Sequence, residues 1–175
     1  MDVVAPEART GPTPPLERRR RAVAGLVLGA GLGGFVDGIV LHQILQWHHM
    51  LTDREGTGLP SPSVRSLEEN TTWDGLFHAA TWLLVVAGLA LLWPLARRGR
   101  TGPGRVLVGL LLAGWGLFNL VEGIVDHHIL TVHHVRDDVA DPLPWDLGFL
   151  LLGVALLAGG RALARGDRRP ATGAP

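Results

Sequence analysis

The chain contains no cysteine among its 175 residues. This absence excludes disulfide bonds, thiolate metal ligands, iron–sulfur clusters and cysteine nucleophiles. The formal net charge is zero, so the overall charge predicts no nucleic-acid or anionic partner. The sequence also lacks the G-x-S-x-G, H-E-x-x-H and P-loop motifs, which leaves hydrolysis without a recognisable site.

The chain is rich in long apolar runs. Hydrophobic residues make up 47% of the sequence, and four apolar runs cover about residues 22–47, 76–95, 106–130 and 147–163. A membrane-spanning helix needs about 20 mostly apolar residues, and each run is long enough. The sequence therefore predicts an all-α integral membrane protein, a four-helix bundle with the lipid bilayer as its surroundings.

The composition divides the chain into one domain and two tails. Residues 1–17 are rich in proline and polar side chains, and residues 166–175 are rich in arginine, proline and glycine. Such compositions are typical of disordered tails. The predicted four-helix domain covers residues 18–165, with halves of about 22–96 and 105–165.

Arginine is concentrated on one side of the predicted topology. Basic groups precede the first run, separate the second from the third, and follow the fourth: Arg18–Arg21, then Arg97, Arg98, Arg100 and Arg105, then Arg161, Arg165, Arg168 and Arg169. The other two loops hold only Arg54, Arg65 and Arg136, amid many acidic residues. The positive-inside rule then predicts a multi-pass membrane protein with both termini in the cytoplasm.

Two stretches of the chain have nearly the same sequence. GFVDGIVLHQILQWHH (Gly34–His49) and NLVEGIVDHHILTVHH (Asn119–His134) align without a gap at an offset of 85, with nine of sixteen positions identical. A second pair, WDGLF (Trp73–Phe77) and WDLGF (Trp145–Phe149), marks the expected starts of the second and fourth helices at an offset of 72. We expect two helical hairpins of the same polarity, a parallel repeat about an axis along the membrane normal. Such repeats often place a site where the halves meet.

All eight histidines fall on the predicted outer half of the topology, several of them within apolar segments. Ionisable groups are costly in a bilayer and therefore favour a functional role. Imidazole and carboxylate together suit transition-metal ions, which bundle cores commonly bind between facing helices. The predicted ligands are Asp37, His42, His49, His78, Glu122, Asp126, His127 and His134.

Helical geometry predicts which of these side chains share a face. At roughly 100° per residue, positions i, i+4 and i+7 lie on one stripe. That spacing groups His42 with Gln46 and His49, and His127 with Thr131 and His134. Asp37 and Glu122 stand five residues before the first histidine of each group, about 140° away in a regular α-helix. A π-bulge would bring residues i and i+5 onto the same face.

Other interpretations remain open at this point. The metal, predicted as Cu, Fe or Zn, would serve binding, delivery or redox chemistry. Alternatively, His42 and His127 would clamp a b-type haem, with the glycine-rich face of the first helix making room for it. A third hypothesis is a small proton- or metal-coupled transporter with Asp37 and Glu122 as relay groups. The spacing does not match the E-x-x-H pattern of diiron bundles.

Several of these residues also have structural interpretations. The paired histidines at 48–49 and 133–134 would be solvated residues at the membrane interface. Asp74 and Asp146 each follow a tryptophan at an expected helix start, where a carboxylate can cap the helix or ligate. Glycine pairs such as Gly25 and Gly29 predict close helix packing. A homodimer or a membrane partner protein is left open by the sequence.

Three segments carry a family resemblance: GFVDGIVLHQILQWHH, NTTWDGLFHAATW and WGLFNLVEGIVDHHILTVHHVR. Together they resemble the DUF2243 group of bacterial membrane proteins. The resemblance covers about residues 22–160. It implies a small polytopic membrane protein with a histidine-rich signature, and it implies no particular activity.

Overall fold

The computed structural model describes residues 14–51 and 64–165, which form four long helices. Two of the helices continue directly into a π-helical segment. In chain order the elements are α1 (Pro15–Asp37), η1 (Gly38–Ile44), α2 (Val64–Arg97), α3 (Gly104–Ile124), η2 (Val125–Ile129) and α4 (Leu143–Arg165). The predicted all-α architecture with four helices is confirmed.

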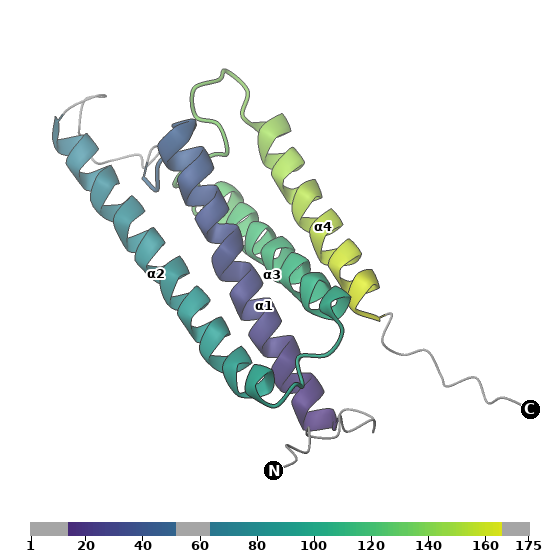
Figure 1. The fold of residues 1–175 in the computed structure, drawn as a ribbon. Coiled ribbons are helices and arrows are strands. Elements are labelled where there is room, and N and C mark those ends of the chain that lie inside the picture. The colour runs from purple at the N-terminus through teal and green to yellow at the C-terminus, as the bar shows by residue number, and fades with distance from the viewer. Residues whose placement is uncertain (1–13, 52–63, 166–175) are drawn as a thin grey trace, which may run out of the picture.

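The helices α1 and α3 form the centre of the molecule (Figure 1). Helix α2 packs on α1 and helix α4 packs on α3, so the two outer helices lie on opposite flanks. The start of α1, the end of α4 and the connection between α2 and α3 share one end of the molecule (Figure 1). The ends of η1 and η2 therefore meet at the opposite end.

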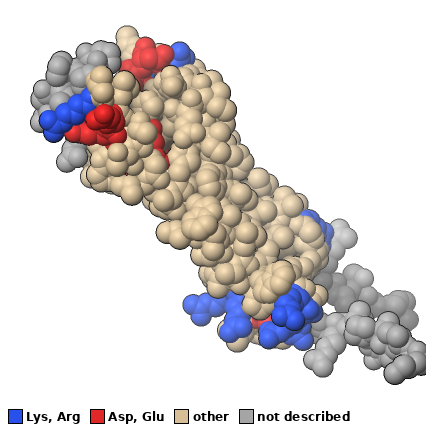
Figure 2. Space-filling model, turned by 60° about the vertical axis from the view of Figure 1, so that its left-hand side comes forward, with Lys and Arg blue, Asp and Glu red and all other residues tan. Residues whose placement is uncertain are grey.

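All four helices are long and apolar enough to cross a membrane, with π-segments counted as part of their helices. On the face shown in Figure 2, arginines gather at one end, acidic residues lie mostly at the other, and the band between them carries little charge. Large apolar side chains point outward from this band, and Leu151 of α4 is 69% exposed. Lipid chains around the helices would cover such a surface at no cost in hydration.

The helix boundaries differ from the sequence prediction in three places. The first helix ends at Ile44 and does not continue to Trp47. Residues 15–17, assigned to the N-terminal tail, belong to α1, while most of both predicted tails lies outside the described residues. Helix α2 begins at Val64, so Asp74 lies inside the helix and cannot cap its start. The capping interpretation is wrong for Asp74 because the polar segment before it is helical as well.

Glycines allow the helices to approach closely. On α1, Gly29 faces the backbone of Leu111 on α3, and Gly114 of α3 faces the backbone of Leu26. Between α3 and α4, Gly109 and Gly160 face each other's carbonyl oxygens. A Cβ at any of these positions would collide with the main chain of the neighbouring helix. Small residues permit such contacts in membranes, where packing and not water drives helix association.

Two adjacent glycines of α4 test this contact. We expect Gly160→Ala to lower the free energy of unfolding by about 1–3 kcal/mol relative to Gly159→Ala, through overpacking. The added methyl at 160 would collide with the Gly109 carbonyl, whereas a Cβ at 159 meets nothing within 4 Å. Both changes alter helix propensity equally, so the difference isolates the packing. Unfolding in detergent, followed by circular dichroism, measures it; equal stabilities would contradict the close contact.

Candidate metal centre

The π-helical segments place each carboxylate beside the histidine that follows it by five residues. In η1 the amide of Leu45 bonds to the carbonyl of Val40 at 2.8 Å, and in η2 Leu130 bonds to Val125 at 2.7 Å. This widening brings Nε2 of His42 to 3.2 Å from Oδ2 of Asp37. The structure contains the π-helical widening that was considered as a condition for this pairing, and the widening resolves the offset of about 140° that a regular α-helix would impose.

Two groups of three side chains form at this end of the molecule. One ligand atom from each of Asp37, His42 and His48 lies within 4.8 Å of the others, and the same holds for Glu122, His127 and His133. All six side chains are buried. We call them the six-residue cluster.

The chain reverses direction after each π-segment, and this reversal decides which histidines enter the cluster. Gln46 has a φ of 52° and Thr131 a φ of 46°, both in the left-handed region. Because no helix continues past these positions, the predicted i, i+4, i+7 stripes are wrong. His48 and His133 fold back into the cluster instead.

The two groups contact each other through their imidazole rings. His48 and His133 stack with centroids 4.6 Å apart and an interplanar angle of 5°. His42 lies 4.4 Å from His48, and His127 lies 4.9 Å from His133, both edge to face. The four rings thus form one continuous assembly between the two halves of the chain.

Asp74 of α2 organises the first half of the cluster. Its carboxylate accepts hydrogen bonds from Nδ1 of His42 at 3.0 Å, from Nδ1 of His49 at 2.7 Å and from the Met50 amide at 3.0 Å. A carboxylate bound to Nδ1 fixes the tautomer and turns Nε2, with its lone pair, toward the cluster.

Asp146 of α4 makes the corresponding contacts in the second half. It accepts from Nδ1 of His134 at 2.7 Å and from the Val135 amide at 2.9 Å. Nδ1 of His127 lies 3.5 Å from Oδ1 of Asp146. Asp146 sits in the first turn of its helix, but its carboxylate reaches the preceding loop and not the amides of its own helix.

A link between the halves fixes His48. Its Nδ1 donates to the carbonyl of Val135 at 2.9 Å, so the ring of the first half is held by backbone of the second. Burial, together with the nearby His42, lowers the pKa of His48 to about 4. Burial, with His48, His127 and His42 adding to it, lowers the pKa of His133 to about 2. Both rings are therefore neutral near pH 7 and keep a lone pair for a cation.

Buried side-chain atoms of the cluster make no hydrogen bond. They are Asp37 Oδ2, His42 Nε2, His48 Nε2, Glu122 Oε1 and Oε2, and both ring nitrogens of His127 and of His133. An unpaired buried polar atom costs about 1–3 kcal/mol, and native proteins contain few of them. Nitrogen and carboxylate oxygen atoms that lie within 4.8 Å of one another in each group fit a metal cation.

The remaining predicted ligands lie around the cluster and not inside either group. His49 and His134 bind the carboxylates of Asp74 and Asp146. His78 donates from Nδ1 to the carbonyl of Asp74 at 2.7 Å. Asp126 lies in η2, one residue before His127, outside the group that Glu122 forms.

The sequence prediction named His49 and His134 as ligands and not their neighbours His48 and His133, and for both pairs it kept open the alternative of solvated residues at the membrane interface. His48 and His133 are at most 2% exposed. The signal available was their identity at matched positions in the two related stretches. What the sequence could not reveal was the left-handed turn at two non-glycine residues, Gln46 and Thr131, a conformation that such residues seldom adopt.

The glycine-rich face of α1 was the proposed room for a haem. In the structure α3 and α2 fill this face: Gly29 packs on the backbone of Leu111, Gly33 on Trp115, and Gly34 on Thr81 and Phe118. The four imidazoles also lie ring against ring. The geometry favours bare ions over a porphyrin.

Comparison with known proteins gives one match. A family described as "Predicted membrane protein (DUF2243)" matches residues 24–167, which is most of the chain. No curated protein and no solved structure matches. The family description agrees with the four apolar helices and names no activity.

Removing the Asp74 carboxylate tests its organising role. We expect Asp74→Ala to lower the free energy of unfolding by about 3 kcal/mol or more, since it leaves buried donors of His42 and Met50 without an acceptor. Glu69→Ala on the same helix, which removes an exposed ion pair with Arg65, should cost about 0.5 kcal/mol or less. Detergent unfolding monitored by circular dichroism compares the two. Similar losses would show that the Asp74 contacts do not hold this region together.

Proposed function

The chain belongs to the DUF2243 family of predicted membrane proteins, and we propose that it binds metal ions in the six-residue cluster. One observation carries the proposal: each group brings ligand atoms of three buried residues within 4.8 Å of one another, and all six residues carry buried atoms that make no hydrogen bond. Structural histidines and carboxylates normally satisfy one another, as Asp74 and His49 do here. The unpaired atoms of the cluster are the ones that a cation would pair.

The donor set indicates which ions are suitable. Each group offers two imidazoles and one carboxylate, a combination that suits iron and also accommodates copper or zinc. Two such groups can hold up to two ions. Asp37 and Glu122 each supply the carboxylate of their own group, so each could ligate an ion held by the two histidines of that group. The correspondence of contacts in the two halves supports the parallel repeat predicted from the sequence.

Burial favours a resident centre over a delivery site. The six ligand residues are at most 5% exposed, so little of the site is open to a partner protein that would receive a cargo ion. Outer carboxylates orient the rings, as they commonly do at metal sites, where they tune affinity. We therefore favour redox chemistry at a retained metal centre over metal transfer to a partner.

The distribution of charge supports an orientation. Arginines lie near the start of α1, just after the end of α2 and at the end of α4, and these parts of the chain share the end of the molecule opposite the cluster (Figure 1). By the positive-inside rule this end faces the cytoplasm. The cluster then lies near the outer face of the bacterial cytoplasmic membrane, with both termini inside.

Two double variants test the ligands. Protein purified in mild detergent should contain about one or two equivalents of Fe, Cu or Zn by elemental analysis, with no Soret band. His42→Ala with His127→Ala should abolish metal retention while membrane insertion is preserved. His48→Asn with His133→Asn removes Nε2 but keeps a donor at the Nδ1 position, so it should lose metal with the fold intact.

The matched control is His78→Ala with His128→Ala. These two histidines bond to the carbonyls of Asp74 and Gly123 and lie outside both groups, so the control should retain its metal. Stoichiometric metal in the His42 and His127 double variant would overturn the ligand assignment. A Soret band would place the protein among haem proteins. No metal and no chromophore after reconstitution would leave a proton-handling or structural network.

A further inference from the structure

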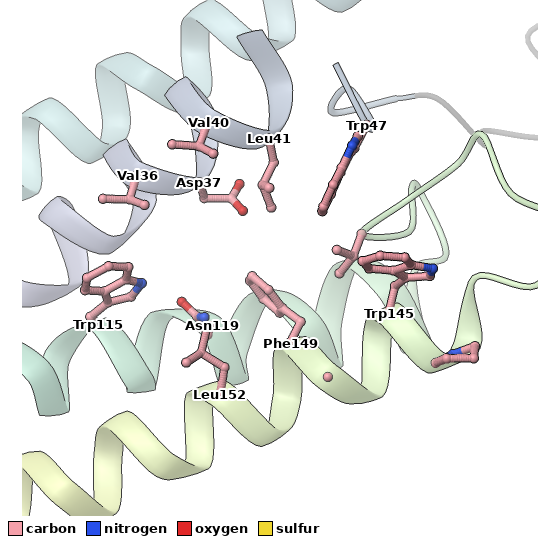
Figure 3. Close-up of a pocket in the computed structure, with 13 residues that line it drawn as sticks. Val36, Asp37, Val40, Leu41, Trp47, Trp115, Asn119, Trp145, Phe149 and Leu152 are labelled. Atoms are coloured by element: carbon pink, nitrogen blue, oxygen red, sulfur yellow. The ribbon is translucent and has the colours of Figure 1, made fainter. Parts of the chain in front are cut away.

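A cavity of about 300 Å³ lies beside the cluster, between α1, α3 and α4 (Figure 3). Its walls are almost entirely apolar, and its polar side chains include Asp37 and Asn119. The aromatic rings of Trp115 and Phe149 stand on opposite sides of it, with Val36 and Leu152 nearby (Figure 3). A cavity of about 150 Å³ binds benzene, so this one has room for a substituted ring.

Two hydrogen-bond acceptors in this cavity lack a partner. Asn119 is only 2% exposed, and its Oδ1 makes no hydrogen bond. Oδ2 of Asp37 is likewise buried without a hydrogen bond. Figure 3 shows both side chains directed toward the open space. An occupant that donates hydrogen bonds would satisfy them, and an occupant without a donor would leave them unpaired at a cost.

Aromatic side chains close the cavity at its outer end. The rings of Trp47 and Trp145 meet edge to face at 5.2 Å. The guanidinium of Arg136 lies over both, 5.1 Å and 4.9 Å from the ring centroids, a cation–π contact. With these rings the outer end of the cavity is lined mainly by apolar surface, which suits an apolar ligand.

A second cavity of about 510 Å³ adjoins the first. It shares the lining residues Val36, Val40 and Trp115 with it, and the rest of its lining is apolar, including Leu111 and Phe35. It lies between α1 and α3 within their membrane-spanning segments. An apolar tail fits here, and such a molecule would enter from the lipid.

We propose that the two cavities bind a lipid-soluble quinol. The hydroxyl-bearing ring would occupy the smaller cavity and donate to Asp37 and Asn119, while the apolar tail would lie in the larger one. The apolar walls fit a ring, the two acceptors fit a hydroxyl donor, and the second cavity fits an apolar tail. The inference rests on the proposed function in one respect. The ring would lie beside Asp37, which the proposed function makes a metal ligand.

Helix α4 offers a blocking variant with a matched control. Gly148 lines the smaller cavity, and a Cβ there meets nothing within 4 Å. Gly159, on the same helix and equally open, does not line it. Full-length protein in nanodiscs would be titrated by calorimetry with a benzoquinol carrying a ten-carbon tail. We expect Gly148→Leu to weaken binding at least about tenfold and Gly159→Leu to leave it unchanged.

The hydroxyl contact is tested separately. The dimethyl ether of the same quinol cannot donate, and we expect it to bind about tenfold more weakly to the unaltered protein. Asn119→Leu should reduce that difference. Equal binding to the Gly148→Leu and Gly159→Leu variants, or equal binding of quinol and ether, would overturn the proposal.

Metal content distinguishes this failure from failure of the proposed function. Elemental analysis of the same samples reports the cluster independently of the cavity, since Gly148 is no ligand. Metal present with no difference between the two leucine variants would overturn the quinol site alone. Metal absent with a difference of about tenfold would overturn the metal centre and support the quinol site.

Discussion

The hydrogen bonds from histidine Nδ1 to Asp74 are the contacts on which the rest of this end of the molecule depends. One carboxylate on α2 binds two rings and the Met50 amide, so it sets the rotation of His42 and the path of the chain after η1 together. The bonds are made on the outer side of the rings, which leaves Nε2 of His42 facing inward. Asp146 makes matching contacts for the second half. Orientation of ligands by carboxylates behind them is a general feature of metal sites.

Close packing of α1 against α3 makes this arrangement possible. The rings of the two halves contact one another only because α1 and α3 approach backbone to backbone at Gly29 and Gly114. Larger residues there would move the helices apart and separate His48 from His133, whose rings stack at 4.6 Å. The glycines lie away from the ligands along the helix axes, yet they set the distance between the two halves of the cluster. Membrane helices rely on such contacts because lipid gives apolar side chains little reason to associate.

Much of the fold followed from composition and periodicity. Four apolar runs correspond to four helices, and the π-helix that would bring Asp37 and His42 onto one face is present. The candidate site was only partly predictable. The sequence indicated Asp37, Glu122, His42 and His127, but it favoured His49 and His134 where the structure brings in their neighbours. The difference lies in one backbone angle at Gln46 and one at Thr131, which tertiary contacts impose against local preference. The capping role considered for Asp74 was wrong because α2 begins before its apolar part.

The bond between His48 and the Val135 carbonyl has a consequence for the order of assembly. Val135 is itself held by Asp146, which belongs to the last helix of the chain. The orientation of the His48 ring thus depends on Asp146. The ribosome makes Asp146 about a hundred residues later, at synthesis rates of roughly 5–20 residues per second. The first half therefore cannot hold all of its rings in place until the second half has been made. A nascent chain stalled before α4 would be long enough to sit in the membrane but would lack the Asp146 contact that holds Val135.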